Sequence, residues 1–184
     1  EELRQLFDVC TVAMRSMAEV PQVVVAQVQG VATAAGAQLA ASADLIVASE
    51  DASFSTPGGK GGLFCHTPMV AVARQIGRKR AVELALTGGE IPAATALDWG
   101  LVNRVVAHDD LESATLEFLR YATRGSRYAK GLGKQTLYAQ LEMTTDDAYD
   151  LAVDVMSRAA ATGDGAEWPR AFTEKRKPEW THTE

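Results

Sequence analysis

The chain has 184 residues, 47% of them hydrophobic and 23% charged, which suits a single domain with a packed core. Its net charge is −6 and its longest basic run is Lys175-Arg176-Lys177, which argues against nucleic acid as the main partner, although a polyphosphate needs only a few local cations. The longest apolar stretches are too short to cross a bilayer, and Cys10 and Cys65 show neither metal-ligand spacing nor a disulfide framework.

The first predicted elements are a helix and a strand. Residues 3–17 place apolar side chains at spacings of three and four, which predicts an amphipathic helix, and Pro21 ends it. Residues 23–28 are β-branched and nearly all apolar, so they predict a strand that is buried on both faces, as in α/β sheets. Because the chain opens inside a helical pattern and without Met, we expect that an N-terminal portion is missing from it.

The next segment is rich in small side chains. Residues 31–43 contain so much alanine that they favour a helix, and their short side chains let another group approach its backbone closely. Residues 45–48 predict a second buried strand. The order strand, helix, strand over residues 23–48 therefore predicts a right-handed crossover with parallel pairing.

A glycine-rich loop is predicted at residues 54–66. Thr67 and Pro68 suit the N-cap and first turn of a helix that ends near Gly77. The remaining predicted elements are short helices at 78–86 and 93–99, a strand at 101–106, and C-terminal helices at 110–123, 127–142, 145–161 and 165–174. The chain is thus predicted to be an α/β core followed by an all-helical part.

The start of the small-residue helix is a candidate site. A helix N-terminus exposes unpaired N–H groups and a partial positive charge, which suit an anion or a carbonyl oxygen that becomes an oxyanion. The first turn, near residues 33–36, has no bulky side chain, so a flat carbonyl group could reach these N–H groups. Close packing of the helix against a strand is the alternative explanation for the small residues.

The loop and the C-terminus hold further candidates. Lys60 lies among glycines, but no Ser or Thr follows it, so the P-loop pattern is absent and a mobile turn is the alternative. Cys65 and His66 are adjacent in sequence, which is more typical of a buried Cys and an ordinary His than of a catalytic pair. The charged run at residues 174–178 is typical of a solvated helix end.

Four segments match one ordered set of motifs: residues 29–44, residues 54–57 with Gly62-Leu63, residues 86–106, and residues 171–178. In this order they resemble the signature segments of the crotonase (enoyl-CoA hydratase/isomerase) superfamily. The resemblance covers nearly the whole chain. Within the superfamily, residues 62–68 are closest to the subgroup called enoyl-CoA hydratase domain-containing protein 3.

The resemblance implies an α/β fold, namely a crotonase-like ββα superhelix without its N-terminal turns, followed by a helical C-terminal region that drives trimerisation. Residues 1–109 would form the C-terminal portion of the ββα core, and residues 110–184 the helical region. It also implies a homotrimer or a dimer of trimers that binds acyl-CoA as a small-molecule partner. Coenzyme A would then be part of the substrate, with no separate cofactor, no metal, no nucleic acid and no membrane span.

Residue roles transfer unevenly from the family. The resemblance assigns a backbone oxyanion N–H to Ala35, and a second such donor to the missing N-terminal part. The two catalytic glutamates correspond to Gln38 and Gly58, neither of which can take a proton from water at neutral pH. The resemblance also assigns substrate or coenzyme A contacts to Ala34, Pro57, Gly61, Gly62 and Leu63, and, from a neighbouring subunit, to Phe172 and Lys175.

The resemblance therefore implies an acyl-CoA-binding protein of fatty-acid or acyl-CoA metabolism, nominally a hydratase (lyase) or isomerase with an atypical active site. A non-catalytic binding or regulatory protein is one alternative. A decarboxylase or thioesterase that uses Lys60 or His66 is another. The composition suits the cytoplasm, although a missing N-terminus could hide an organellar address.

Overall fold

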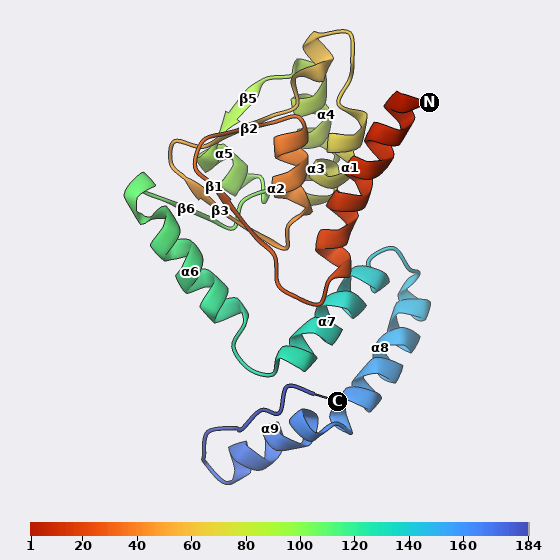
Figure 1. The fold of residues 1–184 in the computed structure, drawn as a ribbon, viewed down its shortest axis with the longest axis vertical. Helices are drawn as coiled ribbons and strands as arrows, with labels where there is room; N and C mark the ends of the chain where they lie inside the picture. The colour runs from red at the N-terminus through yellow and green to blue at the C-terminus, as the bar shows by residue number, and fades with distance from the viewer. Residues whose placement is uncertain (184) are drawn as a thin grey trace. The chain divides into compact units, whose positions relative to one another are not determined.

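The computed structural model describes residues 1–183, which form two compact units (Figure 1). The first unit comprises residues 1–17 and 24–119 and contains all six strands. The second comprises residues 18–23 together with the chain from Arg120 onward, and it is helical apart from its connections. Among the described residues, no helix is both long enough and apolar enough to cross a membrane.

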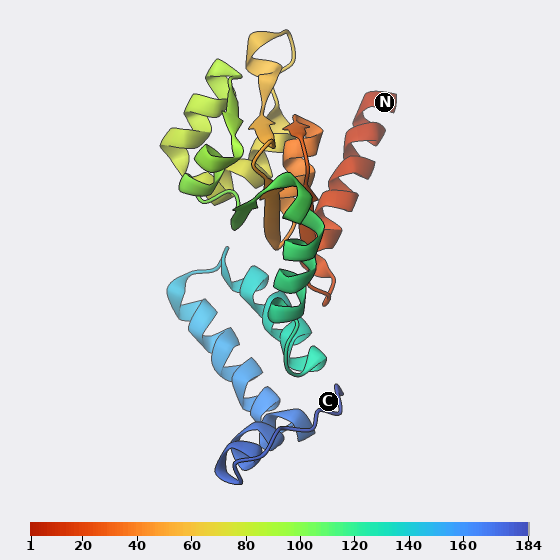
Figure 2. The same ribbon diagram turned by 90° about the vertical axis from the view of Figure 1, so that its left-hand side faces the viewer.

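Helix α1 spans Glu2–Glu19, close to the predicted range, and Arg4 pairs with Asp8 one turn later at 2.9 Å. None of its residues is buried, and none belongs to the apolar core of the first unit. Figure 2 shows α1 (red) and the helices of residues 78–98 (yellow-green) on opposite sides of the strands. The predicted apolar stripe is largely exposed: Leu3, Leu6, Phe7, Cys10 and Ala13 are exposed, and Met14 and Met17 are half-buried.

The first sheet is parallel and has the order β1-β3-β6, with β1 at Val25–Val28, β3 at Leu45–Ser49 and β6 at Arg104–Val106 (Figure 1). Val25 lies opposite Leu45, which confirms the predicted parallel crossover. The prediction that the first strand is buried on both faces is wrong, because β1 is an edge strand and Gln27 is exposed. The central strand β3 is the buried one.

None of the three strands of the second sheet was predicted. It has the order β2-β4-β5, with β2 at Val31–Thr33 parallel to β4 at Ser53–Ser55, and β5 at Glu90–Pro92 antiparallel to β4. The predicted helix at residues 31–43 is therefore wrong in its first residues. Hydrogen bonding to β4 holds residues 31–33 extended, so tertiary pairing overrides their helix propensity, and helix α2 covers only Ala35–Ser42.

Three helices complete the first unit before its last strand: α3 at His66–Ile76, α4 at Arg78–Thr87 and α5 at Ala93–Asp98. The predicted N-cap at Thr67 is wrong, because α3 begins at His66 and Cys65 occupies the cap position without a side-chain hydrogen bond. Helix α2 packs against α3, and the core beneath them is built around Phe54, Val72 and Leu84.

The remaining helices are α6 at Leu111–Ala122, α7 at Arg127–Gln140, α8 at Thr145–Ala160 and α9 at Gly163–Thr173. Three of them begin with a hydroxyl side chain that accepts a hydrogen bond from the first turn, namely Ser126, Thr144 and Thr162. Within the second unit, α8 packs against both α7 and α9. The helical C-terminal part is thus close to the predicted boundaries.

Candidate functional site

The chain turns sharply from β2 into α2 at Ala34. This residue has φ 48° and ψ −111°, a backbone conformation that residues other than glycine rarely adopt. Two backbone hydrogen bonds hold it there: its N–H donates to the Ser55 carbonyl at 2.9 Å, and its carbonyl accepts from the Gln38 N–H at 3.0 Å. The turn is therefore fixed from both sides, and it directs the next N–H away from the sheet ladder.

Ala35, the first residue of α2, carries the N–H that the family resemblance singles out. Ala35 and Gly36 are both exposed, and no acceptor within residues 1–183 takes the Ala35 N–H. Only a methyl group and a hydrogen atom stand at these two positions, so a flat carbonyl group can approach the helix N-terminus. Such an approach places its oxygen where the helix dipole is positive.

The strand ends beside this turn carry a row of hydroxyl groups that the sequence did not single out. Ser55 Oγ donates to Thr33 Oγ1 at 2.9 Å and so ties the ends of β4 and β2 together directly before Ala34. Thr56 is fully buried and donates to the Leu84 carbonyl at 3.3 Å. Ser53 Oγ is buried without a partner among the described residues. Alternating serines in a three-residue strand were the only signal of this row.

Gln38 lies one helical turn after Ala34, and only 7% of it is exposed. Its backbone is engaged, since its N–H donates to Ala34 and its carbonyl accepts from Ser42 Oγ at 2.8 Å. Its side-chain amide makes no hydrogen bond with any described residue. A nearly buried amide that still has free donors and acceptors is suited to hold a water molecule or a polar ligand group.

The loop after β4 surrounds Gly58 closely, the position to which the resemblance assigns the second glutamate. Residues Pro57–Lys60 form a 3₁₀ turn, and the Gly58 N–H donates to the Cys65 sulfur at 3.3 Å. A Cβ atom on Gly58 would overlap the Leu63 carbonyl oxygen and would lie 2.7 Å from the Cys65 nitrogen. Gly59 is similarly confined by the Ala85 carbonyl. No side chain fits at Gly58 in this loop conformation.

The other glycines of this loop have open surroundings. A Cβ atom on Gly61 or Gly62 would meet no atom within 4 Å, and the Leu63 side chain is exposed. Gly61, Gly62 and Leu63 therefore form an accessible rim, whereas Pro57 is half-buried. In contrast to the predicted structureless loop, the segment starts with a strand and a 3₁₀ turn.

Neither of the neighbouring segments supplies a carboxylate. Residues 29–43 and 53–67 contain no Asp or Glu. Cys65 is buried, whereas His66 is exposed and its ring lies 5.1 Å from that of Phe64, which fits a structural Cys and an ordinary His. The local side chains thus offer hydrogen bonds but no acidic group for proton transfer.

Phe172 and Lys175 lie in the second unit, at the end of α9, and both are exposed. The run that contains Lys175 is not a plain solvated helix end, because Arg176 Nη2 lies 3.0 Å from the Glu167 carboxylate. Only 4% of Glu167 is exposed, and it also accepts from Arg170 and from the Glu179 N–H. These bonds lower the pKa of Glu167 and raise that of Arg176, so the pair stays charged.

The chain is similar to a set of known proteins over most of its length. A family model described as enoyl-CoA hydratase/isomerase matches residues 10–183. Enoyl-CoA hydratase domain-containing protein 3, mitochondrial, from Danio rerio is 44% identical over 181 residues, which cover 98% of this chain and 63% of the relative. The chain thus spans somewhat less than two thirds of that relative.

Solved structures give the same result. An enoyl-CoA hydratase from Mycobacterium smegmatis matches with a TM-score of 0.95 and 42% identity, over 100% of this chain and 71% of the other. Human enoyl-CoA hydratase domain-containing protein 3 matches with a TM-score of 0.92 and 44% identity, over 96% of this chain and 70% of the other. At these TM-scores and coverages, nearly every described helix and strand follows the same backbone path in the matched structures.

Proposed function

Because this chain belongs to the enoyl-CoA hydratase/isomerase family and has its crotonase fold, we propose that it binds an acyl-coenzyme A thioester whose carbonyl oxygen accepts a hydrogen bond from the Ala35 N–H. One observation carries this proposal: Ala35 is exposed and its N–H has no acceptor among the described residues, at the start of a helix whose first turn has no large side chain. Ala34 and Gly36 border this helix start.

Polarisation of the thioester carbonyl is the chemistry that this site would supply. A hydrogen bond from a fixed N–H favours the enolate form of the acyl group more than the neutral thioester, because the oxygen then carries more negative charge. A donor of this kind contributes roughly 10²–10³-fold in rate in other enzymes. The Ala35 N–H can therefore stabilise an enolate intermediate, but it cannot transfer a proton by itself.

Hydration by the family's two-carboxylate route does not suit these residues. Gln38 can orient a water molecule through its amide but cannot accept its proton, and Gly58 has no room for any side chain. We therefore propose slow or absent hydration of enoyl-CoA, and a role in binding acyl-CoA or in regulation. Decarboxylation or thioester hydrolysis is the second candidate, because Lys60 and His66 are exposed on the loop beside Gly58.

Coenzyme A contacts are proposed for two sets of residues. The rim of the loop, with Pro57, Gly61, Gly62 and Leu63, offers backbone groups and an exposed apolar side chain. Phe172 and Lys175 would contact coenzyme A from a neighbouring subunit of a homotrimer, where an exposed aromatic ring suits adenine and an exposed ammonium group suits a phosphate.

The free cysteines suit a reducing compartment, either the cytosol or the mitochondrion for which the zebrafish relative is named.

The proposed role of the Ala35 N–H as a hydrogen-bond donor can be tested by deleting this N–H. Replacing Ala35 by lactic acid turns its amide into an ester and deletes the N–H without changing the side chain. We expect butyryl-CoA labelled with ¹³C at the carbonyl to show a lowered carbonyl stretching frequency when bound to the unmodified protein, and we expect the ester at Ala35 to abolish that shift. The same replacement at Ala37, which is buried in the same turn, is the matched control and should keep the shift.

Three outcomes would contradict the proposal or a part of it. If calorimetry detects no binding of acetyl-, butyryl- or crotonyl-CoA, acyl-CoA is not the ligand. If crotonyl-CoA is hydrated within tenfold of the rate of an ordinary hydratase, the roles given to Gln38 and Gly58 are wrong. Unaltered vibrational shifts in the Ala35 ester would remove this N–H from the site while leaving acyl-CoA binding intact.

A further inference from the structure

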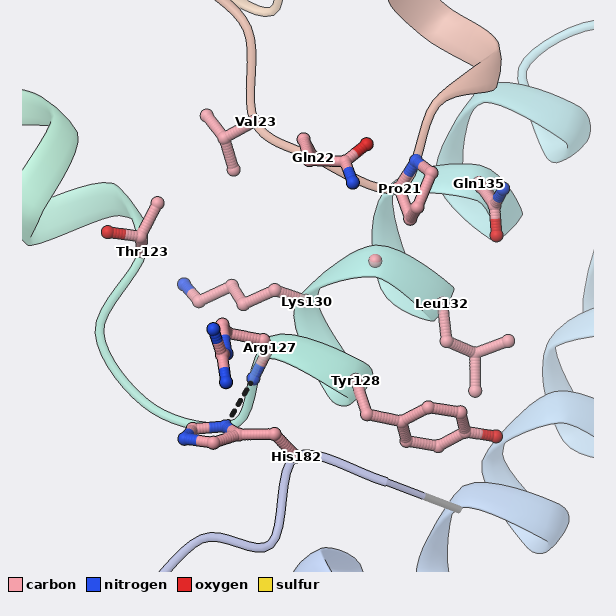
Figure 3. A pocket seen from close by; sticks show the side chains of 11 residues that line it. Pro21, Gln22, Val23, Thr123, Arg127, Tyr128, Lys130, Leu132, Gln135 and His182 are labelled. Carbon is pink, nitrogen blue, oxygen red and sulfur yellow. Dashed lines mark hydrogen bonds between the residues drawn. The ribbon is translucent and has the colours of Figure 1, made fainter.

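A pocket of about 760 Å³ lies within the second unit (Figure 3), whereas the small-residue helix α2 belongs to the first. Its wall is built from four segments: residues 21–23 of the linker, Thr123 after α6, the first turns of α7, and the C-terminal tail at His182. None of its lining residues belongs to α2 or to the glycine-rich loop. The pocket is therefore a feature that the proposed acyl-CoA site does not explain.

The linker wall is fixed to α7. Lys134 Nζ donates to the Gln22 carbonyl at 2.7 Å, and Gln135 Nε2 donates to the Glu19 carbonyl at 2.9 Å. A Cβ atom on Gly131 would lie 2.7 Å from that of Pro21, so the glycine lets the linker pack directly on the helix. This side of the pocket is consequently preformed.

The tail wall is fixed as firmly. Asp164 accepts hydrogen bonds from the Thr181 N–H at 2.7 Å and from the His182 N–H at 3.0 Å. The Arg127 N–H donates to His182 Nδ1 at 3.1 Å, drawn as a dashed line in Figure 3. Because Nδ1 of the neutral ring is an acceptor here, Nε2 carries the hydrogen and can donate to a ligand.

Positive charge gathers in the pocket. Figure 3 shows Arg127 and Lys130 extending toward the side of the pocket where Thr123 and His182 lie. No Asp or Glu is among the lining residues, and neither cation forms an ion pair with a described residue. Arg127 and Lys130 are both exposed, and together they give this cavity a local positive potential that favours an anionic ligand, although the net charge of the chain is −6.

We propose that this pocket binds a small phosphate ester. The Arg127 guanidinium suits two phosphate oxygens at once, Lys130 adds a point charge, and the His182 Nε2–H adds a neutral donor. The volume exceeds what a single phosphate group fills, and Tyr128 and Leu132 offer apolar surface for the organic part of such a ligand. This inference does not depend on the acyl-CoA site.

The test is calorimetry at low salt with two probes, inorganic pyrophosphate and ADP. We expect one site per chain and an affinity that falls as salt is added, because salt screens the cations. The double variant Arg127→Gln/Lys130→Gln should lose at least about tenfold in affinity for both probes, since a single charged hydrogen bond contributes that much. Lys177→Gln removes one exposed charge outside the pocket and is the matched control, with unchanged affinity.

The result that overturns the proposal is equal binding in the double variant and the Lys177→Gln control, or no binding of either probe to the unaltered protein. Lys130→Gln alone replaces the double variant in this test if the double variant does not fold, and its thermal midpoint should match that of the control.

Adding acetyl-CoA to the ADP complex identifies the natural source of the phosphate. Displacement of ADP assigns the pocket to the phosphates of coenzyme A, and retention assigns it to a separate phosphate ester. The Ala35 ester leaves this measurement unchanged, so the two proposals fail independently.

Discussion

Ala34 carries the strain of the turn that presents the Ala35 N–H. A non-glycine residue at φ 48° and ψ −111° costs about 1–3 kcal/mol, whereas glycine adopts this conformation freely. Ala34→Gly should therefore raise the free energy of unfolding by about 1 kcal/mol after the entropy cost of glycine is subtracted. Urea denaturation measures the change. Ala35→Gly, one position later in the helix, is the control and should instead lower stability; equal destabilisation by both variants would refute strain at Ala34.

Gly58 sets a limit on how this site can be re-engineered. Restoring a carboxylate with Gly58→Glu should not restore hydration, because its Cβ would overlap the Leu63 carbonyl and displace the loop. Overpacking of this kind costs about 2 kcal/mol, which a thermal unfolding scan detects. Gly61→Glu puts the same side chain into open space in the same loop and should leave the midpoint nearly unchanged. A stable and active Gly58→Glu protein would show that the loop opens at little cost.

The residues that the sequence did not reveal are mostly polar groups with distant partners. Asp164 and Glu167 look like ordinary surface acids of a helix, yet they are buried by Thr181, His182 and Arg176, which follow nine or more residues later. The backbone turn at Ala34 was also invisible, since nothing about alanine marks a positive φ. Conversely, the small residues at 33–36 marked the helix start as a candidate site, and only the family motif assigned the role to Ala35.

At the scale of elements, periodicity predicted the helices well because each long helix repeats its pattern over several turns. The helices α1, α4 and α6 to α9 begin and end within three residues of the predicted positions. The strands β2 and β5 were missed because each has only three residues and depends on β4, which is distant in sequence. Burial of the strand at residues 23–28 was overestimated, since no sequence pattern shows which strand lies at a sheet edge.

The hydrogen bonds that hold Thr181 and His182 to Asp164 of α9 should weaken at low pH. Hydrogen bonds from the Ser126 side chain, and from Thr181 and the His182 N–H, lower the pKa of Asp164 from 3.8 to about 2, against the opposing effect of burial. A carboxyl group with a lowered folded-state pKa stabilises the fold fully above about pH 4, and this contribution is lost as the pH falls toward 2. The Thr181 amide resonance should therefore titrate with an apparent pKa of about 2 in NMR spectra.

Two variants make that titration specific. Asp164→Asn should remove the Thr181 titration, because the amide stays neutral throughout. Asp150→Asn, which changes an exposed acid on α8, should leave it as it is. A Thr181 titration that persists in Asp164→Asn would assign the acid dependence to another group, such as Glu167.

On the scale of the whole molecule, the family motifs predicted the crotonase fold and the helical C-terminal region, and both are confirmed by structures with TM-scores of 0.95 and 0.92. What the motifs did not predict is the basic pocket of the second unit, because its lining comes from four segments that no single motif contains. A net charge of −6 gave no hint of it either. Average charge describes the whole surface, whereas ligand recognition depends on a few local groups.

The hydrogen bonds from Thr181 and His182 to Asp164 have a practical consequence. Loss of residues 181 and 182 removes their donors from the Asp164 carboxylate and leaves this buried anion with the Ser126 side chain as a remaining donor. It also deletes the imidazole that borders the basic pocket. Loss of these two residues would thus change both the anchoring of the tail and the pocket, so their presence should be verified by mass spectrometry before any ligand titration.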